Sequence, residues 1–497
     1  MSNTVVVVGG GFGAIASALR CRSAGFDVTV VERLDRLGGR AQVFTRNGFK
    51  FDAGPTVITA PFLFEELFSL FDEKLEDYLT FKPLEVWYRY HFSDGTQLNY
   101  NGNKEEMEQQ IRLRNNSDVE GYRKLLSHSE KIFDVGFTQL AGVSFHKLST
   151  MIRQIPQLLR LRADRTVSQM IAHYITDENL RQAFSIHPLL VGGNPFSTTS
   201  IYTLIHYLEQ KWGVHFCMGG TGKLVDELSA LMKRHGINIR LGADVKKIVS
   251  TRKQVTNVEL SNGETIPAAS VICNADPPTV YRELLEVDGA PDRRKKIAIP
   301  ERFTKYSMGL YVLFFGTRKT FPKIAHHTIW LGSRFKELLR EIFDGAALPE
   351  DFSLYIHRPT ATDETFAPPG CDSYYVLCPV PNLLASIDWD IQGELLKDRI
   401  LTALDQTIMP GLMATVVDEF WMDPTDFKQQ YRAMNGAGFS IAPIFRQSAW
   451  FRYHNVDPHI SNLYFAGAGT HPGAGLPGVV SSAKVIEKLI SKRNRRS

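Results

Sequence analysis

The N-terminal part of the sequence runs strand, glycine-rich turn, helix and second strand, and this order restricts the fold more than any other feature. Thr4–Val8 is β-branched throughout, which is typical of a strand buried on both faces of a parallel sheet. A glycine turn follows at 9–14, then an Ala- and Leu-rich helix at 15–24 and a second buried strand at 27–31. This order predicts a Rossmann unit that binds a dinucleotide.

The residues of the turn have separate expected roles. Gly9 permits the tight turn, and Gly11 lets the backbone approach a pyrophosphate at the helix N-terminus. Ala14 stands where a third glycine is usual, a change that the motif tolerates. Glu32 ends the second strand about 20 positions after Gly11, where a carboxylate accepts the ribose hydroxyls and disfavours a 2′-phosphate. We assign cofactor binding here to Gly9, Gly11, Phe12, Gly13, Ala14, Glu32 and Arg33.

FAD and NAD share this fingerprint, and the next two loops distinguish between them. The loop 37–41 offers two glycines and an arginine that can bind a phosphate or hold the turn. The turn 51–56 would bring backbone N–H groups near a bound ring. Placed directly after a Rossmann unit, both loops resemble those of glutathione-reductase-like flavoproteins, which include amine oxidases and carotene desaturases. We therefore expect FAD, with contacts from Gly38, Gly39, Arg40, Gly54, Pro55, Thr56 and Val57.

Composition narrows the class of protein. With 497 residues, 43% of them hydrophobic, the chain is long enough for two or three globular domains. A formal net charge of +4 over this length does not predict a nucleic-acid partner. The five cysteines are scattered and contain no Cys-x-x-Cys pair, so neither a disulfide framework nor a zinc site is expected. No signal sequence and no uncharged stretch long enough to span a bilayer is visible, which predicts a soluble or peripheral protein.

The whole chain is expected to be an α/β protein with a split Rossmann-type FAD-binding domain. We assign this domain to residues 1–75, 212–290 and 441–497. Residues 76–100 and 291–440 are expected to form a substrate domain with a mixed sheet, which contains a polar hairpin at 88–100. The mostly helical insertion 101–211 is expected to contact the membrane and to admit the substrate.

Two later segments are expected to return to the cofactor. Residues 219–222 precede a helix at 223–235 and four short strands at 238–241, 244–250, 255–260 and 270–273, with Val245 near the adenine and Asp276 in a loop that returns to the cofactor. The segment 462–479 is a strand, a glycine-rich loop and a helix start, predicted to meet the flavin through Gly467, Ala468, Gly469, Gly478 and Val479. Ala468 replaces an aspartate that many flavoproteins use for the ribityl chain. The aromatic strands between 299 and 439 are equally consistent with a core and with a channel for a long apolar ligand.

With these motifs in place, the sequence resembles bacterial phytoene desaturases over nearly its full length. The resemblance is carried by the strings at 51–59, 189–196, 200–205 and 467–477, and Ala468 agrees with these desaturases. It implies FAD, a C40 or C30 carotene precursor, peripheral attachment to the cytoplasmic face of the cell membrane, and stepwise dehydrogenation. Phytoene would pass through phytofluene and zeta-carotene to neurosporene or lycopene. Quinone or oxygen would accept the electrons, because no second nucleotide fingerprint is present.

The catalytic groups are less defined than the cofactor site. Hydride transfer to the flavin would leave an allylic cation that loses a proton, and His187 and the pair His326-His327 are candidate acceptors. Arg153 is a candidate for a charged residue needed for turnover. No Ser-His-Asp arrangement, paired carboxylate motif or HExxH sequence is present, which disfavours hydrolase and metal mechanisms. An amine or porphyrinogen oxidase and a non-enzymatic prenyl-binding protein remain alternatives, and the oligomeric state is not predicted.

The segment 147–165 alternates basic and apolar residues, a pattern typical of a helix that lies in an anionic lipid interface and almost equally of a solvated helical pair that covers the core. The lipid-soluble substrate that the resemblance implies favours contact with the membrane. Pro156 is expected to divide it into two helical pieces. The basic segment 488–496 is expected to aid binding to lipid.

Overall fold

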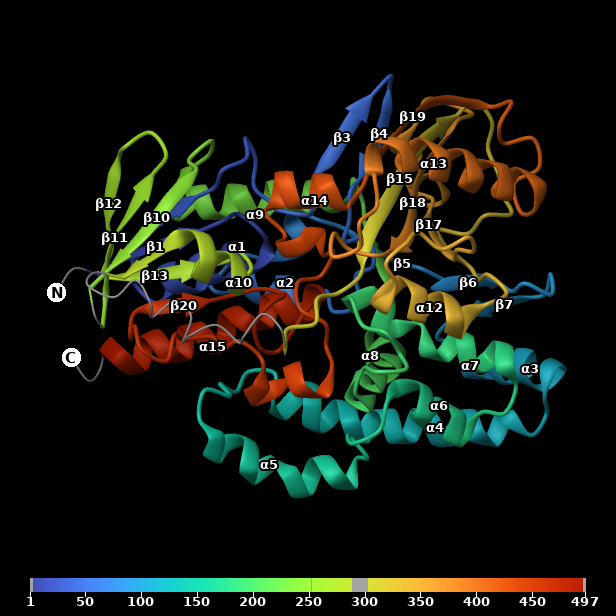
Figure 1. Ribbon diagram of the computed structural model, residues 1–497, viewed down its shortest axis with the longest axis horizontal. Coiled ribbons are helices and arrows are strands. Elements are labelled where there is room, and N and C mark those ends of the chain that lie inside the picture. The colour runs from blue at the N-terminus through green and yellow to red at the C-terminus, as the bar shows by residue number, and fades with distance from the viewer. Residues whose placement is uncertain (1–2, 252, 288–302, 495–497) are drawn as a thin grey trace.

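The computed structural model describes residues 3–251, 253–287 and 303–494, and its framework is a parallel five-stranded sheet (Figure 1). The strand order is β20-β13-β1-β2-β9. The strands come from three distant parts of the chain: β1 (Thr4–Val8), β2 (Asp27–Val31), β9 (Asn238–Arg240), β13 (Ser270–Cys273) and β20 (Leu463–Phe465). The three predicted segments of the cofactor domain therefore meet in one sheet. The boundary predicted at 290/291 lies outside the described residues.

Helix α1 (Phe12–Ser23) packs on this sheet, and α9 (Gly220–Arg234) and α15 (Leu476–Asn494) pack on α1 and share its apolar core. Helix α1 begins at Phe12, three residues earlier than predicted, because Gly11 is an extended N-cap and Ile15 N–H already donates to its carbonyl at 3.0 Å. Buried Arg20 ties α1 to two other helices through Glu487 of α15 and Glu66 of α2 (Phe62–Ser69). The two chain ends are thus held on one side of the molecule (Figure 1).

A separate four-stranded sheet has the order β12-β11-β10-β14. Its strands are β10 (Val245–Ser250), β11 (Val255–Leu260), β12 (Thr265–Pro267) and β14 (Leu285–Val287). Of the four strands predicted between 238 and 273, only the first and the last join the parallel sheet. The middle two pair antiparallel, and their alternating burial shows that each covers the core with one face.

The substrate domain contains a mixed seven-stranded sheet of order β19-β15-β18-β17-β16-β6-β7, as predicted. Its strands are β6 (Tyr88–His91), β7 (Gln97–Tyr100), β15 (Gly309–Thr317), β16 (His327–Trp330), β17 (Leu354–His357), β18 (Asp372–Val380) and β19 (Val416–Met422), and three helices lie beside them: α12 (Phe335–Asp344), α13 (Trp389–Gln406) and α14 (Pro424–Tyr431). The hairpin predicted at 88–100 is present, but it is not polar. Tyr88, Tyr90 and Tyr100 are almost completely buried.

The insertion is helical, as predicted, and lies along the lower edge of the view in Figure 1. It contains α3 (Lys104–Arg114), α4 (Asp118–Phe133), α5 (Leu148–Arg160), α6 (Val167–Tyr174), α7 (Glu178–Ser185) and α8 (Leu204–Trp212). The prediction that Pro156 divides the basic segment is wrong. Helix α5 passes through Pro156 without a break, because Met151 before it and Leu161 after it are both anchored in a small apolar cluster. Within the described residues, no helix has the length and apolarity needed to cross a bilayer.

Candidate active site

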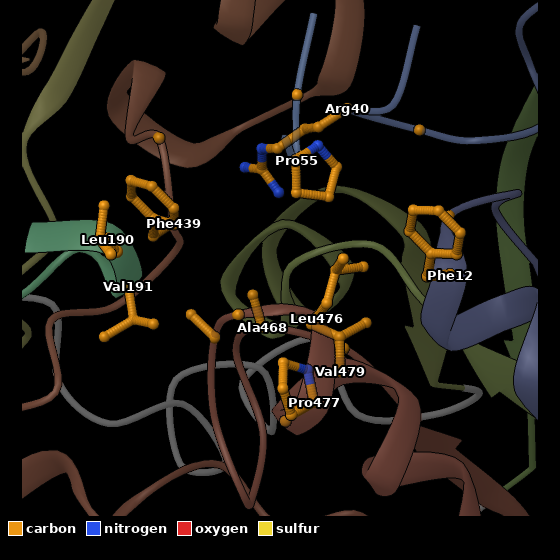
Figure 2. Close-up of a pocket in the computed structure, with 18 of the residues that line it drawn as sticks. Phe12, Arg40, Pro55, Leu190, Val191, Phe439, Ala468, Leu476, Pro477 and Val479 are labelled. Carbon is orange, nitrogen blue, oxygen red and sulfur yellow. The ribbon is translucent and has the colours of Figure 1, made fainter. Parts of the chain in front are cut away.

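One cavity of about 590 Å³ connects the glycine fingerprint with the substrate domain and the helical insertion. At one end it is lined by backbone atoms of the first strand-helix turn, and at the other by apolar side chains from both sheet and helices. In Figure 2, Arg40 and Pro55 lie on one side of this cavity, opposite Ala468, Leu476 and Pro477. A single space is therefore shared by the predicted cofactor loops and the predicted substrate channel.

The phosphate end is shaped by close backbone contacts. A Cβ atom on Gly11 would lie 2.5 Å from Asn274 Oδ1, and Asn274 is itself held by a 3.0 Å bond from its Nδ2 to the Ala466 carbonyl. A Cβ on Gly39 would lie 3.1 Å from Gly11 Cα. Gly38 N–H donates to the Gly10 carbonyl at 2.8 Å, which docks the second glycine loop on the first. Only glycine leaves room for a ligand phosphate at this junction.

Glu32 lies where the ribose hydroxyls of a dinucleotide would bind. Its side chain is buried, and Glu32 Oε1 accepts a 2.8 Å hydrogen bond from Leu34 N–H. Burial raises the pKa of this carboxyl, although the backbone N–H groups of Leu34 and Gly10 act in the opposite direction. The carboxylate is thus oriented by the backbone and still lines the cavity, as a ribose acceptor must.

Several polar atoms along the cavity are buried without a hydrogen-bond partner among the described residues. They are Arg40 Nε, Asp244 Oδ1 and Asp276 Oδ2, and the Arg40 guanidinium lies 3.9 Å from Asp276. Unsatisfied buried polar groups are costly, so atoms of this kind that line a cavity indicate a polar ligand. The residues present therefore fit a dinucleotide cofactor between the glycine fingerprint and the Asp276 loop.

The last glycine-rich loop forms the wall opposite Arg40 and Pro55 (Figure 2). Gly467 N–H donates to Ser482 Oγ at 3.0 Å, and the Ala468 carbonyl accepts from the buried Arg452 guanidinium at 2.5 Å. Both bonds fix the loop from behind, so its cavity side presents backbone and the side chains of Ala468 and Val479. An aspartate is not needed to hold this loop in place.

Most of the predicted cofactor residues line the cavity, and three do not: Gly13, Ala14 and Gly469. Gly13 faces Gly467, where a Cβ would lie 3.2 Å from the Gly467 backbone, and Ala14 is completely buried in α1. A Cβ on Gly469 would lie 2.4 Å from Pro277. These positions allow the loops to pack closely instead of touching a ligand. All the other predicted residues, from Gly9 to Val479, are on the wall.

The other half of the cavity is apolar, with walls that include Leu190, Ile205, Leu208, Met308, Leu310 and Ile329. Polar side chains interrupt this lining, and Tyr88, Glu209 and Tyr355 are among them. Sequence reasoning missed Tyr88 and Glu209, whereas Tyr355 lies in the aromatic strands that were predicted to form either a core or a channel. A signal existed for Glu209, because it follows Ile205 by one helical turn and therefore lies on the apolar face of α8, where a charged residue is unusual.

None of the predicted catalytic side chains lines the cavity. His187 is buried behind the wall, with Nε2 2.9 Å from Glu209 Oε2. His327 lies behind Tyr355, whose hydroxyl is 2.8 Å from His327 Nδ1, and buried His326 packs against it. Arg153 is exposed on α5. The structure therefore leaves these residues at a distance from any ligand in the cavity, and the histidine on its wall is His471, which was not predicted.

Comparison with known proteins identifies the class and then the family. The chain matches the model for flavin containing amine oxidoreductases over residues 14–485, so it is a flavin-dependent oxidoreductase. It is 47% identical to a lycopene-forming phytoene desaturase of Pseudescherichia vulneris over 98% of both chains. A lycopene-forming phytoene desaturase of Pantoea ananas is 46% identical over 97% of this chain and 98% of its own. A neurosporene-forming one of Cereibacter sphaeroides is 38% identical over 98% and 94%. The chain belongs to the bacterial phytoene desaturase family, as its motifs predicted.

Solved structures share the fold at low sequence identity. Putrescine oxidase superposes with a TM-score of 0.65 at 16% identity over 99% of both chains. Cyclohexylamine oxidase from Brevibacterium oxydans IH-35A gives 0.61 at 18% identity, again over 99% of both. The predicted α/β fold, with a parallel Rossmann-like sheet and a separate mixed sheet, is therefore confirmed.

Proposed function

We propose that this protein binds FAD and dehydrogenates phytoene stepwise, by way of phytofluene and zeta-carotene, with lycopene as the favoured end product and neurosporene as the alternative. One observation carries the proposal: the cavity continues from the cofactor loops into a long apolar space. A polyene without polar groups can be held there only by such a lining. The family membership and the lycopene-forming relatives support the same substrate.

The side chains around the cavity have two tasks in this reaction. When bound, FAD supplies the acceptor for a hydride and its two electrons. Leu190, Ile205 and Leu310 hold the substrate carbons and exclude water, which protects the cationic polyene from attack. The loop that carries Thr56 is fixed by a 2.6 Å bond between Thr56 Oγ1 and the Tyr355 hydroxyl. This bond joins the cofactor side of the cavity to the substrate sheet.

The decisive experiment mixes purified protein, FAD and phytoene liposomes anaerobically with a quinone and follows visible absorbance. We expect bands of conjugated carotenes to appear in order of increasing length, and the oxidised flavin spectrum to return as quinone is consumed. A preparation that forms no conjugated product, yet oxidises an amine or a porphyrinogen, would contradict the proposal. A C30 precursor offered in parallel tests whether the shorter substrate is preferred.

We further propose that α5 docks on the cytoplasmic surface of the cell membrane. Four apolar side chains form one exposed stripe along this helix, with exposed fractions of 49% for Leu148, 56% for Ile152, 42% for Ile155 and 58% for Leu159. The adjacent side of α5 contributes Met151 and Leu158 to the cavity wall. A lipid-soluble substrate could therefore move from the bilayer into the cavity beside the same helix.

Neighbouring features support this surface. Phe445 and Phe451 are also exposed, and Phe445 lines the cavity. Apolar groups besides those of α5 are therefore present at the end of the cavity that α5 lines. Arg153 and Arg160 are exposed on α5, where they can meet lipid phosphates. We assign Arg153 this role. The end of the predicted basic segment 488–496 lies outside the described residues.

Flotation with anionic liposomes tests the docking surface. The double variant Ile152→Ser and Leu159→Ser should float less than the wild-type protein while keeping its flavin. The matched control is Ile391→Ser and Leu395→Ser on α13, where the two side chains are 58% and 50% exposed but far from the cavity. Equal flotation of all three proteins would remove α5 as the membrane contact.

A further inference from the structure

A buried carboxylate stands in the apolar half of the cavity. Glu209 of α8 has no exposed surface to bulk solvent, yet it lines the cavity between Leu208 and Tyr88. A charge in such surroundings is expensive unless it is paired and hydrogen-bonded. The neighbouring residues on this face of α8, Ile205 and Leu208, are apolar, so an apolar side chain at position 209 would also suit the helix.

Two side chains orient this carboxylate. The Tyr88 hydroxyl donates to Glu209 Oε1 at 2.8 Å, and His187 Nε2 lies 2.9 Å from Oε2. His187 Nδ1 is buried without a hydrogen-bond partner among the described residues. The hydrogen bond to Glu209 is therefore the one that the His187 ring makes there. The carboxylate thus has one bond to each oxygen, and each oxygen keeps a free lone pair.

Two of the groups around Glu209, Tyr88 and His206, are neutral. Burial, and then the charge of Glu209, raises the pKa of Tyr88 well above its usual value. Burial, and then His187, lowers the pKa of His206 well below its usual value, and the His206 ring lies 4.3 Å from that of His187. Tyr88 is therefore a hydrogen-bond donor and His206 an uncharged neighbour.

Glu209 is connected to the cofactor side of the cavity through other side chains. Its partner Tyr88 packs on the His327 ring at 5.9 Å, and Tyr355 packs on the same ring at 5.7 Å. Tyr355 in turn bonds Thr56 in the cofactor loop at 2.6 Å. Tyr88, His327 and Tyr355 thus link the carboxylate to that loop, and Glu209 and Thr56 both line the same cavity.

We propose that Glu209 is the catalytic residue that accepts the proton in each dehydrogenation, with His187 and Tyr88 as positioning residues. This inference rests on the proposed function. One C–H bond of the substrate breaks and its hydrogen leaves with the electron pair as hydride, for which bound FAD would supply the acceptor. The C–H bond of the adjacent carbon then breaks. Its proton bonds to a Glu209 oxygen, and its electron pair becomes the new C=C bond.

The cycle closes with a quinone or oxygen as the terminal oxidant, which would accept the two electrons from bound FAD. Glu209 releases the proton to water after the product leaves the cavity. Among the described residues that line the apolar half, Glu209 is the one carboxylate. The other acidic residues on the wall, Glu32, Asp244 and Asp276, lie at the dinucleotide end.

The test measures anaerobic reduction of the bound flavin by phytoene liposomes. Glu209→Gln keeps the size and can keep both hydrogen bonds, but it cannot take a proton. We expect reduction to slow by roughly 10²–10⁴-fold, the usual contribution of a general base, with flavin content unchanged. Tyr88→Phe removes one hydrogen bond and retains the carboxylate, and should slow reduction by only about tenfold.

Chemical rescue separates a proton acceptor from a structural residue. Formate should restore flavin reduction in Glu209→Ala, whereas formamide, of similar size and without charge, should not. Flavin reduction in Glu209→Gln within threefold of the wild-type rate, or loss of flavin from both the Gln and the Ala variants, would overturn the role of Glu209 and leave the proposed function intact. Wild-type protein whose flavin stays oxidised with phytoene would overturn the proposed function, and this inference with it.

Discussion

The two halves of the cavity are built from different parts of the polypeptide. The dinucleotide half is lined mainly by backbone, with glycines at 9–11, 38–39 and 467, and its contacts are set by how closely loops approach one another. The substrate half is lined by side chains that stand on strands and helices, such as Leu190, Leu310 and Ile329. The first half depends on the absence of side chains, and the second on their volume.

This difference predicts different tolerance to substitution. A Cβ atom placed between two backbones has nowhere to move, because both loops are held by their own hydrogen bonds. A change of shape in an apolar wall is absorbed by neighbouring side chains when the volume is kept. Substitutions in the dinucleotide half should thus remove the cofactor, whereas those in the substrate half should alter turnover and product pattern.

The largest effect is expected at Gly11. Gly11→Ala would place a Cβ 2.5 Å from Asn274 Oδ1 and close the approach of a phosphate, so FAD affinity should fall by about 3 kcal/mol, more than a hundredfold. Fluorescence titration of the apoprotein with FAD measures this. The control is Gly142→Ala, whose Cβ would meet only the end of the Lys488 side chain at 3.2 Å. Equal affinity of the two variants would contradict the backbone account of this half.

The next effect concerns Asp52, which lies where the halves join. Asp52 on β4 (Phe49–Asp52) accepts from Thr221 N–H of α9 at 3.0 Å, and burial raises its pKa from 3.8 to about 6. As pH rises between these two pKa values, Asp52 loses its proton in the unfolded chain before it does so in the folded protein. Stability therefore falls as pH rises through this window, by about 3 kcal/mol at most.

Asp52→Asn removes this titration. As pH rises from about 4 to 7, the unfolding temperature of the wild-type protein should fall relative to that of the variant. The altered hydrogen bonds should add a small difference that does not depend on pH. Thermal unfolding at both pH values measures the difference. Identical pH profiles for the two proteins would show that the pKa of Asp52 is the same in the folded and unfolded states.

A smaller effect is expected at Glu32. Glu32→Ala removes a charged acceptor of the ribose hydroxyls, and FAD affinity should fall by about 1.5–3 kcal/mol. Asp27→Ala is the matched control, because Asp27 lies at the other end of β2 with its side chain 78% exposed. An Asp27 variant that loses as much FAD as the Glu32 variant would show that the loss comes from the strand and not from the ribose contact.

The smallest effect is expected in the apolar wall. Leu190→Met keeps the side-chain volume, so FAD content should stay the same and turnover should change by less than about tenfold. The proportions of neurosporene and lycopene report any change in substrate position. Loss of FAD from this variant would break the distinction between the two halves.

The same distinction explains what the sequence could predict. The fingerprint, Glu32 and the 467–479 loop were found because their roles depend on local residue type and spacing, such as glycine at a close approach. Glu209 and Tyr88 were missed because their function arises from burial against one another across 121 residues of sequence. The hairpin 88–100 was predicted to be polar because the sequence does not show whether a tyrosine hydroxyl binds water or, as in Tyr88, a buried carboxylate.

Two other features have physical reasons as well. The strands β10 and β11 were predicted, but not the sheet that they join; they lie outside the parallel sheet because their alternating burial suits a sheet with one covered face. Pro156 did not divide α5, because tertiary contacts at both ends of the helix outweigh one missing hydrogen bond. In α5, packing overrode the local preference of proline.

The parallel sheet ends on β20, which pairs with β13 and is formed by residues 463–465. Strand β13 also pairs with β1, which begins at Thr4, so this sheet joins segments that lie far apart in the chain and are synthesised at different times. While the ribosome is still adding the middle of the chain, β13 lacks β20 and α1 lacks the helix that carries Glu487. We therefore expect FAD to bind only after the last glycine loop has been synthesised. Until then, the valine-rich first strand has to be kept from contacts with other apolar surfaces.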